Sequence, residues 1–412
     1  MPTRDDAGRR DATDALGPMR ELFDLPAGVV YLDGNSLGAL PAAVPDRLAR
    51  VIREEWGGSL IRAWTDHDWW SAPLRVGDRI GRLIGAAPGQ VSVGESTSVQ
   101  LFNTLAAAAR LDRDRDVLLT DAGHFPTDRY LADSVGRLLG LRVIAIPAAE
   151  LADAISEWAD RVGVVAVPAV DYRTGELWDV AGITAAAHAA GAVAVWDLCH
   201  AVGAVPLSLD EDGVDFAVGC TYKYLGGGPG APAFVYVAHR HQRAFEPPLT
   251  GWHGHAAPFA MEPEFRPAEG ISRTRIGTPH VLSLLALDSA LDVFDKADLA
   301  DVRAKSLALA DFFLDCLGDL VLDGTFEVVT PRAPHRRGSQ LALRHRAAYE
   351  MITALIERDV IGDMRPPDLL RFGFNGLYVS FRDVHRAAAE LRDIVASGVY
   401  LDARFATRRL IT

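Results

Sequence analysis

The chain has 412 residues, of which 49% are hydrophobic and 24% are charged, and its formal net charge is −13. A chain of this length exceeds the size at which one hydrophobic core usually stops growing, so we expect two domains. The acidic balance argues against nucleic acid or an anionic membrane as a partner, although one buried arginine would suffice for an anionic substrate.

The N-terminal part of the chain divides into a tail and a segment that we assign to a smaller domain. Residues 1–20 are polar and are expected to form a loose tail, and residues 21–60 are expected to pack with the smaller domain. A short strand leads into a turn-prone loop that contains Asn35 and Ser36. Residues 45–56 have helical spacing. A tryptophan cluster follows at Trp64, Trp69 and Trp70. We interpret it as core or interface, because aromatic side chains dominate burial energetics.

Residues 61–280 alternate between short apolar runs and helical stretches. The runs that predict strands are residues 91–93, 117–120, 143–146, 164–167, 193–197, 216–219 and 233–237. The stretches that predict helices are residues 99–110, 130–139, 149–159 and 183–190. Apolar runs without alternation, joined by helices, are typical of a largely parallel sheet covered on both faces. The sequence therefore predicts an α/β large domain with a mostly parallel seven-stranded sheet.

Residues 281–412 have a different character and predict a smaller α+β domain. One long helix over residues 281–317 is expected to link it to the large domain. Shorter strands and helices are expected at residues 340–343, 348–358, 369–372 and 384–395. The basic segment 332–337 is interpreted as a solvated loop.

Cysteine usage and hydropathy indicate the compartment. Cys199, Cys220 and Cys316 are widely spaced and odd in number, so they form neither a disulfide framework nor a zinc pattern. No apolar run approaches the ~18 residues that a membrane span needs, and no signal peptide is visible. We expect a cytoplasmic protein without a bound metal.

Lysine is rare in this chain: Lys223, Lys296 and Lys305 are the only three. Lys223 stands immediately before a glycine-rich turn, residues 226–230, whereas the other two lie in an acidic helical segment and are interpreted as surface charges. Arginine cannot lose its proton, but a partly buried lysine can and then serves as an amine nucleophile. The placement of Lys223 therefore favours amine chemistry, with an ordinary surface charge as the alternative.

Functional side chains follow the predicted strands where those strands end. Thr97 and Ser98 open a helix after one strand, where hydroxyl and N–H groups can bind a phosphate or simply cap the helix. Phe125 follows a second strand, Asp197 ends a third, and Lys223 follows a fourth. Ligands of parallel sheets gather at these carboxyl ends. An anion cradle, an aromatic ring, a carboxylate and a lysine are the groups that pyridoxal phosphate requires.

Several motifs resemble one enzyme family. Asp197-Leu-Cys-His200 and Tyr222-Lys223-Tyr-Leu-Gly resemble the aspartate-aminotransferase-like fold of pyridoxal-phosphate enzymes, and within it the kynureninases. The resemblance runs over nearly the whole chain, from the segment Tyr31-Leu-Asp-Gly-Asn35-Ser-Leu-Gly38 to Arg371. It also includes Phe125-Pro-Thr-Asp128, Gly251-Trp252-His-Gly254-His255 and Arg275-Ile-Gly-Thr278-Pro279.

The resemblance implies a role for each matching residue. Lys223 would bind the cofactor covalently and then shuttle protons, Asp197 would pair with its ring nitrogen, and Tyr222 is a candidate acid. The further cofactor contacts implied are Thr97, Ser98, Phe125, Asp128, His200 and Tyr222, with Trp252 and Thr278 contributed by the other subunit of a homodimer. Arg371 would bind the substrate carboxylate bidentately, with Trp64, Ser36 and Asn35 as further substrate contacts.

The implied reaction is hydrolysis of L-kynurenine to anthranilate and L-alanine in the tryptophan/kynurenine pathway, which also feeds NAD biosynthesis. Trp64 and Thr278 resemble the bacterial type, so L-kynurenine is expected to be preferred over 3-hydroxykynurenine. Pro168 departs from the family, which often has a hydroxyl-bearing residue there to contact the cofactor. The alternatives are a cysteine desulfurase or aminotransferase of the same fold, and a non-catalytic relative that only binds pyridoxal phosphate. Neither Cys199 nor Cys220 suits a desulfurase, because both flank apolar strands.

Overall fold

The apolar runs between residues 91 and 237 form a seven-stranded sheet in the computed structural model, which describes residues 1–407. The strands are β4 (Val91–Val93), β5 (Val117–Asp121), β6 (Arg142–Ile146), β7 (Val162–Pro168), β8 (Val193–Asp197), β9 (Phe216–Gly219) and β10 (Phe234–Val237). Their order is β4-β10-β9-β8-β7-β5-β6, with only β10 antiparallel to its neighbours. The mostly parallel sheet is thus confirmed.

Helices cover both faces of this sheet, which explains why its strands lack polar alternation. Leu118 and Val195 face the core that contains α6 (Thr97–Ala109) and α7 (Pro126–Leu139). Leu119 and Trp196, the next residue in each strand, face the opposite core. That second core is built with α5 (Ala72–Leu83), α8 (Leu151–Glu157), α9 (Val180–Ala189) and α11 (Val281–Ala290).

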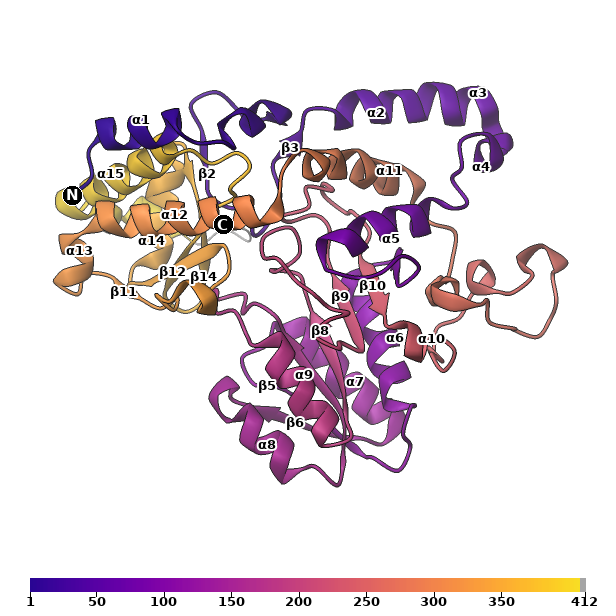
Figure 1. The fold of residues 1–412 in the computed structure, drawn as a ribbon. Coiled ribbons are helices and arrows are strands. Elements are labelled where there is room, and N and C mark those ends of the chain that lie inside the picture. The colour runs from indigo at the N-terminus through magenta and orange to yellow at the C-terminus, as the bar shows by residue number, and fades with distance from the viewer. Residues whose placement is uncertain (408–412) are drawn as a thin grey trace.

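A second sheet of four antiparallel strands lies beside the first body (Figure 1). It is formed by β11 (Glu327–Val328), β12 (Gln340–Arg344), β15 (Leu369–Gly373) and β14 (Asp363–Arg365), in that order. It packs with α12 (Leu299–Leu317), α14 (Ala348–Ile356) and α15 (Phe381–Ser397) around a core of phenylalanines. The strand and helix predictions for this region therefore fall on real elements.

The link between the two bodies is interrupted, so the prediction of one long helix over residues 281–317 is wrong. Helix α11 continues into a 3₁₀ turn, Leu291–Lys296, and Ala297 is extended. The Asp298 side chain then accepts a hydrogen bond from Ala300 N at 2.8 Å and caps α12. An N-capping aspartate starts a new helix without any glycine or proline to announce the break.

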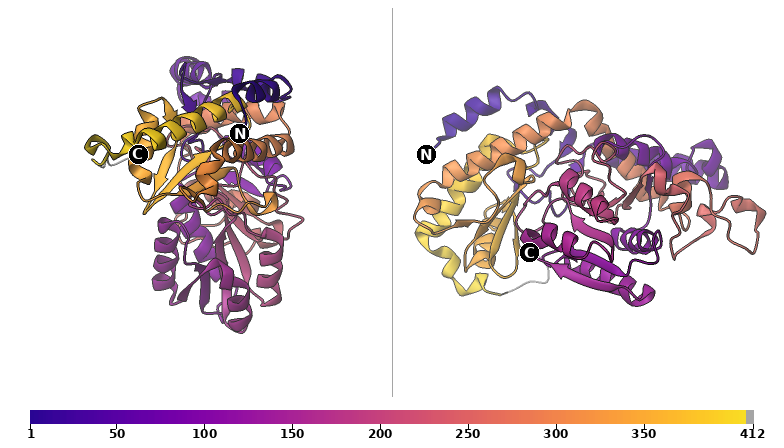
Figure 2. Two further views of the ribbon diagram at one scale, coloured as in Figure 1. Left: turned by 90° about the vertical axis from the view of Figure 1, so that its left-hand side faces the viewer. Right: turned by 60° about the horizontal axis from the view of Figure 1, so that its bottom comes forward.

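The N-terminus is folded, so the prediction of a loose tail is wrong. Arg4–Ala12 form α1, in which Thr3 and Asp6 make a reciprocal capping box and Ala7 is buried. Helix α1 lies alongside α15 (Figures 1 and 2). Asp11 accepts hydrogen bonds from Phe381 N at 2.7 Å and Arg382 N at 3.1 Å, which are free donors at the start of α15. The acidic residues in the first turn of α1 and the basic residues in its last turn suit the two ends of a helix. In the sequence alone, the same charges indicated a polar tail.

Two basic residues interpreted as solvated are buried instead. Lys305 leaves only 8% of its side chain exposed and pairs with Asp14 at 2.7 Å. Arg337, from the predicted solvated loop, is 1% exposed and bonds Asp311 at 2.6 Å. In both cases a long side chain reaches back to a carboxylate on a different segment, which local sequence does not reveal.

The N-terminal segment joins both bodies. Strand β2 (Val30–Tyr31) pairs in parallel with β13 (Val360–Ile361) in the second body. Helix α2 (Val44–Arg50) packs against α11, and a π-helical turn, Val51–Trp56, extends it. Shorter elements are β1 (Phe23–Asp24), β3 (Leu40–Pro41), α3 (Gly57–Ser59), α4 (Ala63–Asp66), α10 (His239–Gln242) and α13 (Asp319–Leu322). Within residues 1–407 no helix is both long and apolar enough to cross a membrane.

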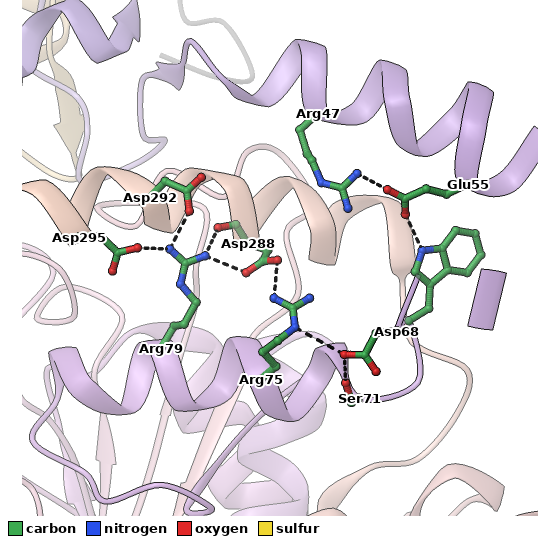
Figure 3. Close-up of polar contacts among 10 residues, drawn as sticks. Arg47, Glu55, Asp68, Ser71, Arg75, Arg79, Asp288, Asp292 and Asp295 are labelled. Carbon is green, nitrogen blue, oxygen red and sulfur yellow. Dashed lines mark hydrogen bonds and ion pairs between the residues drawn. The ribbon is translucent and has the colours of Figure 1, made fainter. Parts of the chain in front are cut away.

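An ion-pair network fastens α5 to the interrupted link (Figure 3). Arg79 contacts Asp288 and Asp292 at 2.8 Å each and Asp295 at 2.7 Å. Arg75 contacts Asp288 at 2.7 Å. The network ties a helix of the large sheet to the segment that leads into the second body.

Candidate active site

A cavity of about 260 Å³ opens at the carboxyl ends of the parallel strands. It brings together eight residues that the sequence had nominated as cofactor contacts: Thr97, Ser98, Phe125, Asp128, Asp197, His200, Tyr222 and Lys223. Its other lining residues are His124, Thr127, Leu131, Pro168, Val170, Tyr172 and Cys199. Residues spread over more than a hundred positions thus converge because parallel strands place their carboxyl ends on one edge.

The segment that carries Lys223 follows β9 and is shaped by the glycines after it. Gly226, Gly228 and Gly230 have φ of +68°, +85° and +74°, a region that residues with a Cβ rarely adopt. The loop of residues 33–38 packs on the same segment, where Gly38 N donates to Tyr222 O at 2.8 Å. A Cβ on Gly38 would lie 2.2 Å from Lys223 O, so this close approach requires glycine.

Lys223 is paired with a histidine whose tautomer is fixed. Lys223 Nζ lies 2.9 Å from His200 Nε2, and His200 Nδ1 lies 3.0 Å from Gln340 Oε1. The Gln340 amide is oriented because its Nε2 donates to the carbonyls of Asp171 and Tyr172. Its Oε1 therefore accepts from Nδ1–H, which leaves Nε2 to accept from Lys223. Burial, and then the Lys223 charge, lower the pKa of His200 well below its ordinary value and keep the ring neutral.

Three further polar side chains meet on the other side of the cavity. One ligand-type atom from each of His124, Asp128 and Asp197 lies within 4.8 Å of the others. Burial, and then the Asp197 charge, raise the pKa of Asp128 well above its ordinary value. Asp197 Oδ1 accepts a hydrogen bond from Cys199 N at 2.8 Å, and His124 Nδ1 accepts one from Phe125 N at 2.9 Å.

The first turn of α6 offers an anion site. Ser96 caps the helix by accepting from Val99 N at 3.3 Å, so Thr97 and Ser98 are left to line the cavity. The N–H groups of a first helical turn have no partner within the helix and attract anions. A second hollow of about 470 Å³ shares Thr97 and Tyr222 with the cavity and also contacts Ser36.

The residues present fit pyridoxal phosphate. The cavity supplies an amine from Lys223, a buried carboxylate from Asp197 and hydroxyl and N–H donors at the start of α6. Phe125 is 44% exposed, so its ring is available for stacking, and Tyr172 contacts it edge-on with the ring centres 5.1 Å apart. Pro168 lines the cavity without offering a side-chain donor. The donor set matches the cofactor's phosphate, ring nitrogen and aldehyde.

Arg371 lies behind the cavity and is completely buried. It donates from Nε to Asp363 Oδ1 at 2.8 Å, from Nη2 to Asp363 Oδ2, and from Nη1 to the carbonyl of Tyr172. Nη2 also donates to Ser36 Oγ at 3.0 Å. Asp363 thus binds the Nε/Nη2 edge of the guanidinium group. The Nη1/Nη2 edge faces the Tyr172 carbonyl and Ser36. Neighbouring Asn35 is fully buried, and its side-chain amide has no partner among the described residues.

Six nominated residues do not line this cavity: Arg371, Ser36 and Asn35, which form the group just described, and Trp64, Trp252 and Thr278. Trp64 contacts Trp69 and Trp70, and Trp70 contacts Trp252 with ring centres 5.5 Å apart. Trp252 is 39% exposed, and Thr278 is an exposed residue after the 3₁₀ turn Gly270–Thr274. The aromatic group therefore forms its own cluster, between the α4–α5 segment that carries Trp64, Trp69 and Trp70 and the loop that carries Trp252.

Sequence reasoning missed four residues of this region. His124 and Tyr172 line the cavity, Gln340 orients His200, and Asp363 holds Arg371. His124 carried a usable signal, because it precedes Phe125 at a strand end. Gln340 and Asp363 gave none, since a polar residue in a short strand usually faces solvent.

The comparisons with known proteins agree with this geometry. The chain matches the Kynureninase C-terminal domain family over residues 302–391. A kynureninase of Burkholderia pseudomallei strain 1106a is 47% identical over 420 residues, which cover 100% of both chains. A kynureninase of Deinococcus radiodurans is 50% identical over 391 residues, 93% of this chain and 94% of the relative.

Solved structures show the same fold at low identity. The cysteine desulfurase CsdA of Escherichia coli superposes with a TM-score of 0.79 at 19% identity, covering 93% of this chain and 98% of the other. A C-DES mutant with glycine covalently linked to its pyridoxal-phosphate cofactor gives 0.80 at 14% identity, covering 90% and 98%. These structures confirm the predicted α/β fold, and at such identities they show the fold alone.

Proposed function

The chain belongs to the kynureninase family, and from that premise we propose how its residues hydrolyse L-kynurenine to anthranilate and L-alanine. The observation that carries the proposal is the convergence of Lys223, Asp197 and the start of α6 on one cavity. Water is added across the Cβ–Cγ bond, so that the acyl carbon becomes the carboxyl of anthranilate and Cβ becomes the methyl of alanine. We place the reaction in tryptophan catabolism, and the three free, buried cysteines are consistent with the reducing cytoplasm.

Cofactor binding is assigned to the cavity residues. Lys223 anchors pyridoxal phosphate, Asp197 pairs with its ring nitrogen, and Phe125 stacks on the ring. The remaining contacts are Thr97, Ser98 and Tyr222 at the phosphate, with Asp128 and His200 beside the ring. Bound pyridoxal phosphate supplies an electron sink that stabilises negative charge on the substrate.

Proton transfer is assigned to Lys223 and Tyr222. Neutral His200 accepts a hydrogen bond from Lys223 Nζ and holds the amine in place, so that it can take the proton from the substrate Cα. Burial, and then the neighbouring cysteines, raise the pKa of Tyr222 above its ordinary value, which keeps its hydroxyl protonated. Tyr222 is thereby a proton donor for the carbon that becomes the alanine methyl group.

Substrate binding is assigned to the group around Arg371. The Nη1/Nη2 edge of Arg371 donates to the Tyr172 carbonyl and to Ser36 Oγ, and it would exchange these partners for the α-carboxylate in a bidentate pair. Ser36 and Asn35 lie on the adjoining loop, and the unpaired amide of Asn35 is a ready donor and acceptor for substrate. Trp64 and Thr278 are proposed to favour an unsubstituted ring.

We propose a homodimer with shared active sites. Trp252 and Thr278 would reach the phosphate of the other subunit, since neither lines the cavity of its own chain. Exposed apolar side chains in residues 51–62 and in the loop that carries Trp252 support an interface: Ile52, Trp56, Leu60, Ile61, Phe259 and Met261. An exposed apolar patch of this kind marks an association surface.

The desulfurase alternative is disfavoured by the cysteines. A cysteine that carries persulfide sulfur must be mobile and accessible, whereas Cys199, Cys220 and Cys316 are all buried. A relative that only binds the cofactor would have no use for a buried, oriented arginine beside the cavity.

The test is to add L-kynurenine to purified holoenzyme and follow anthranilate fluorescence. Lys223→Ala should lose the visible absorbance of the anchored cofactor, whereas Arg371→Ala should keep the absorbance and lose substrate affinity. Turnover of 3-hydroxykynurenine should be clearly lower. Comparable turnover of the two substrates would contradict the ring preference, and absence of anthranilate would contradict the function.

A further inference from the structure

Four charged side chains form a group behind the cavity, which we call the clamp cluster: the buried Arg371 and Asp363 and the partly buried Arg365 and Asp33. Asp363 is its centre and is 1% exposed. Its carboxylate accepts the fork from Arg371, Ser36 Oγ–H at 2.7 Å and Arg365 Nη2 at 2.8 Å. Burial acts to raise the pKa of Asp363, but the two arginines outweigh it and hold the pKa below its ordinary value. Asp363 is therefore the fixed negative charge of the cluster.

Asp33 is the second carboxylate and is poorly compensated. It lies on the loop after β2, and its Oδ1 is buried without a hydrogen-bond partner among the described residues. Ser36 donates its one hydroxyl proton to Asp363, so it cannot at the same time donate a hydrogen bond to Asp33. Burial and the Asp363 charge raise the pKa of Asp33 to about 7, against the opposing effect of Ser36 and the arginines. Asp33 thus stands near the point of balance between its charged and neutral forms at neutral pH.

The other titratable groups around Asp33 keep a constant charge in this range. Tyr31 precedes it, Tyr224 follows Lys223, and Tyr378 lies beyond β15. Burial raises the pKa of all three, so they remain neutral. Burial also raises the pKa of Tyr172, whose carbonyl accepts a hydrogen bond from Arg371. Asp33 is therefore the group of this neighbourhood whose charge changes near pH 7.

The charge of the clamp cluster decides what an arriving carboxylate meets. With Asp33 ionised, two arginines and two carboxylates sum to zero, and a substrate carboxylate would add an uncompensated negative charge to a buried site. With Asp33 protonated, the cluster carries one positive charge, which the substrate carboxylate neutralises. Uncompensated buried charge is strongly unfavourable.

We propose that binding of the substrate carboxylate at Arg371 is coupled to protonation of Asp33. The proposal rests on the proposed function, because it takes Arg371 as the carboxylate site. By linkage, a ligand that prefers the protonated form promotes uptake of that proton. The KM for substrate then rises by up to roughly tenfold per pH unit above the midpoint of Asp33. Asp33 acts through Arg371 and not on the reacting atoms.

The decisive variant is Asp33→Asn, which keeps the shape but fixes a neutral side chain. We expect the holoenzyme variant to retain at pH 8.5 the KM that it has at pH 6.5, while the KM of the wild type rises roughly tenfold or more over this range. Asp215→Asn is the matched control, since Asp215 is also a buried carboxylate paired with an arginine. Asp215 lies at the start of β9, whereas Lys223 and the cavity follow the end of that strand. The control should show the wild-type pH dependence. The same rise in KM in wild type and Asp33→Asn would overturn the proposal.

A second measurement needs no variant. Calorimetric titration of wild-type holoenzyme with L-alanine at pH 7.5, in two buffers of different ionisation enthalpy, counts the protons taken up. Ethylamine, which lacks the carboxylate, serves as the comparison. Greater uptake with L-alanine supports the coupling, and equal uptake contradicts it. If L-kynurenine were not hydrolysed, the proposed function would fail, whereas this titration would still decide whether carboxylate binding takes up a proton.

Discussion

Lys223 and His200 form a donor–acceptor pair whose direction is set from outside the cavity. Gln340 lies on β12 of the second body, yet it determines which nitrogen of His200 faces the lysine. The same body supplies Arg371 and Asp363, so the substrate site that we propose depends on a sheet that contributes nothing to the lining of the cavity. The proposed chemistry therefore depends on residues that orient His200 and Arg371, as well as on the residues that would touch the cofactor.

Replacing Gln340 tests this dependence. Gln340→Leu leaves His200 Nδ1–H buried without an acceptor, which should cost about 1–3 kcal/mol of unfolding free energy. We also expect the pH titration of the bound cofactor's visible absorbance to shift, because His200 would no longer present a fixed acceptor to Lys223. The control is Gln90→Leu, which removes a buried amide bonded to Asp210 at 2.7 Å, away from the cavity. An unshifted titration in Gln340→Leu would contradict the assigned role.

Helix α5 and the α11 link depend on the ion pairs drawn in Figure 3. Arg79 is 15% exposed and meets three aspartates, whereas Arg82, one turn further, is 67% exposed and lies 3.7 Å from Asp295. Partly buried, multiply bonded pairs contribute measurably to stability, but exposed single pairs contribute little. We therefore expect Arg79 to contribute much more to the free energy of unfolding than Arg82 does.

Arg79→Ala should lower the free energy of unfolding by about 1–3 kcal/mol, because three aspartates would lose their shared cation. Arg82→Ala should change it by less than about 0.5 kcal/mol. Urea unfolding of the two variants at low and high salt provides the measurement. Equal effects of the two substitutions would show that the network adds nothing beyond a surface charge.

The start of β9 carries a pH-sensitive contact. Burial opposes ionisation of Asp215, but hydrogen bonds from His241, Ala194 N, His188 and Arg240 outweigh it and lower its pKa to about 2. Because the folded pKa lies below the ordinary 3.8, this stabilisation is present above about pH 4 and is lost as the pH falls toward 2. The shift corresponds to about 2 kcal/mol.

Asp215→Asn should therefore be less stable than the wild type at pH 6, with the difference shrinking below pH 4. Urea midpoints measured from pH 3 to pH 6 would follow it. A stability difference that stayed constant over this range would mean that packing, and not ionisation, accounts for the effect.

For the molecule as a whole, the candidate site draws on both bodies, because the second body supplies Gln340 and Arg371 beside the cavity. We propose that the site also draws on a second subunit. Mixing inactive Lys223→Ala with Trp252→Ala under subunit exchange tests this. If Trp252 serves the partner's site, each mixed dimer has one intact site, and activity should recover to about a quarter of the wild type. Activity equal to the mean of the two parent variants would indicate that each chain completes its own site.

The sequence by itself determined the large sheet and the cofactor side of the site. Unbroken apolar strands buried on both faces leave few alternatives for their arrangement, and parallel strands bring their ends to one edge wherever the chain connects them. Thr97, Phe125, Asp197 and Lys223 could therefore be grouped before any coordinates were known. The lysine was recognisable because arginine serves nearly everywhere else.

Only the tertiary structure decided the contacts between distant segments. Folding of α1 depends on its packing against α15, and the burial of Lys305 depends on Asp14, both far apart in sequence. The partners of Arg371 likewise come from separate elements: Asp363 from β14 and Ser36 from the loop after β2. Charged side chains are read locally as surface residues, because the free energy of burying them is recovered only from a partner that the fold supplies. The clamp cluster is for that reason visible in three dimensions alone.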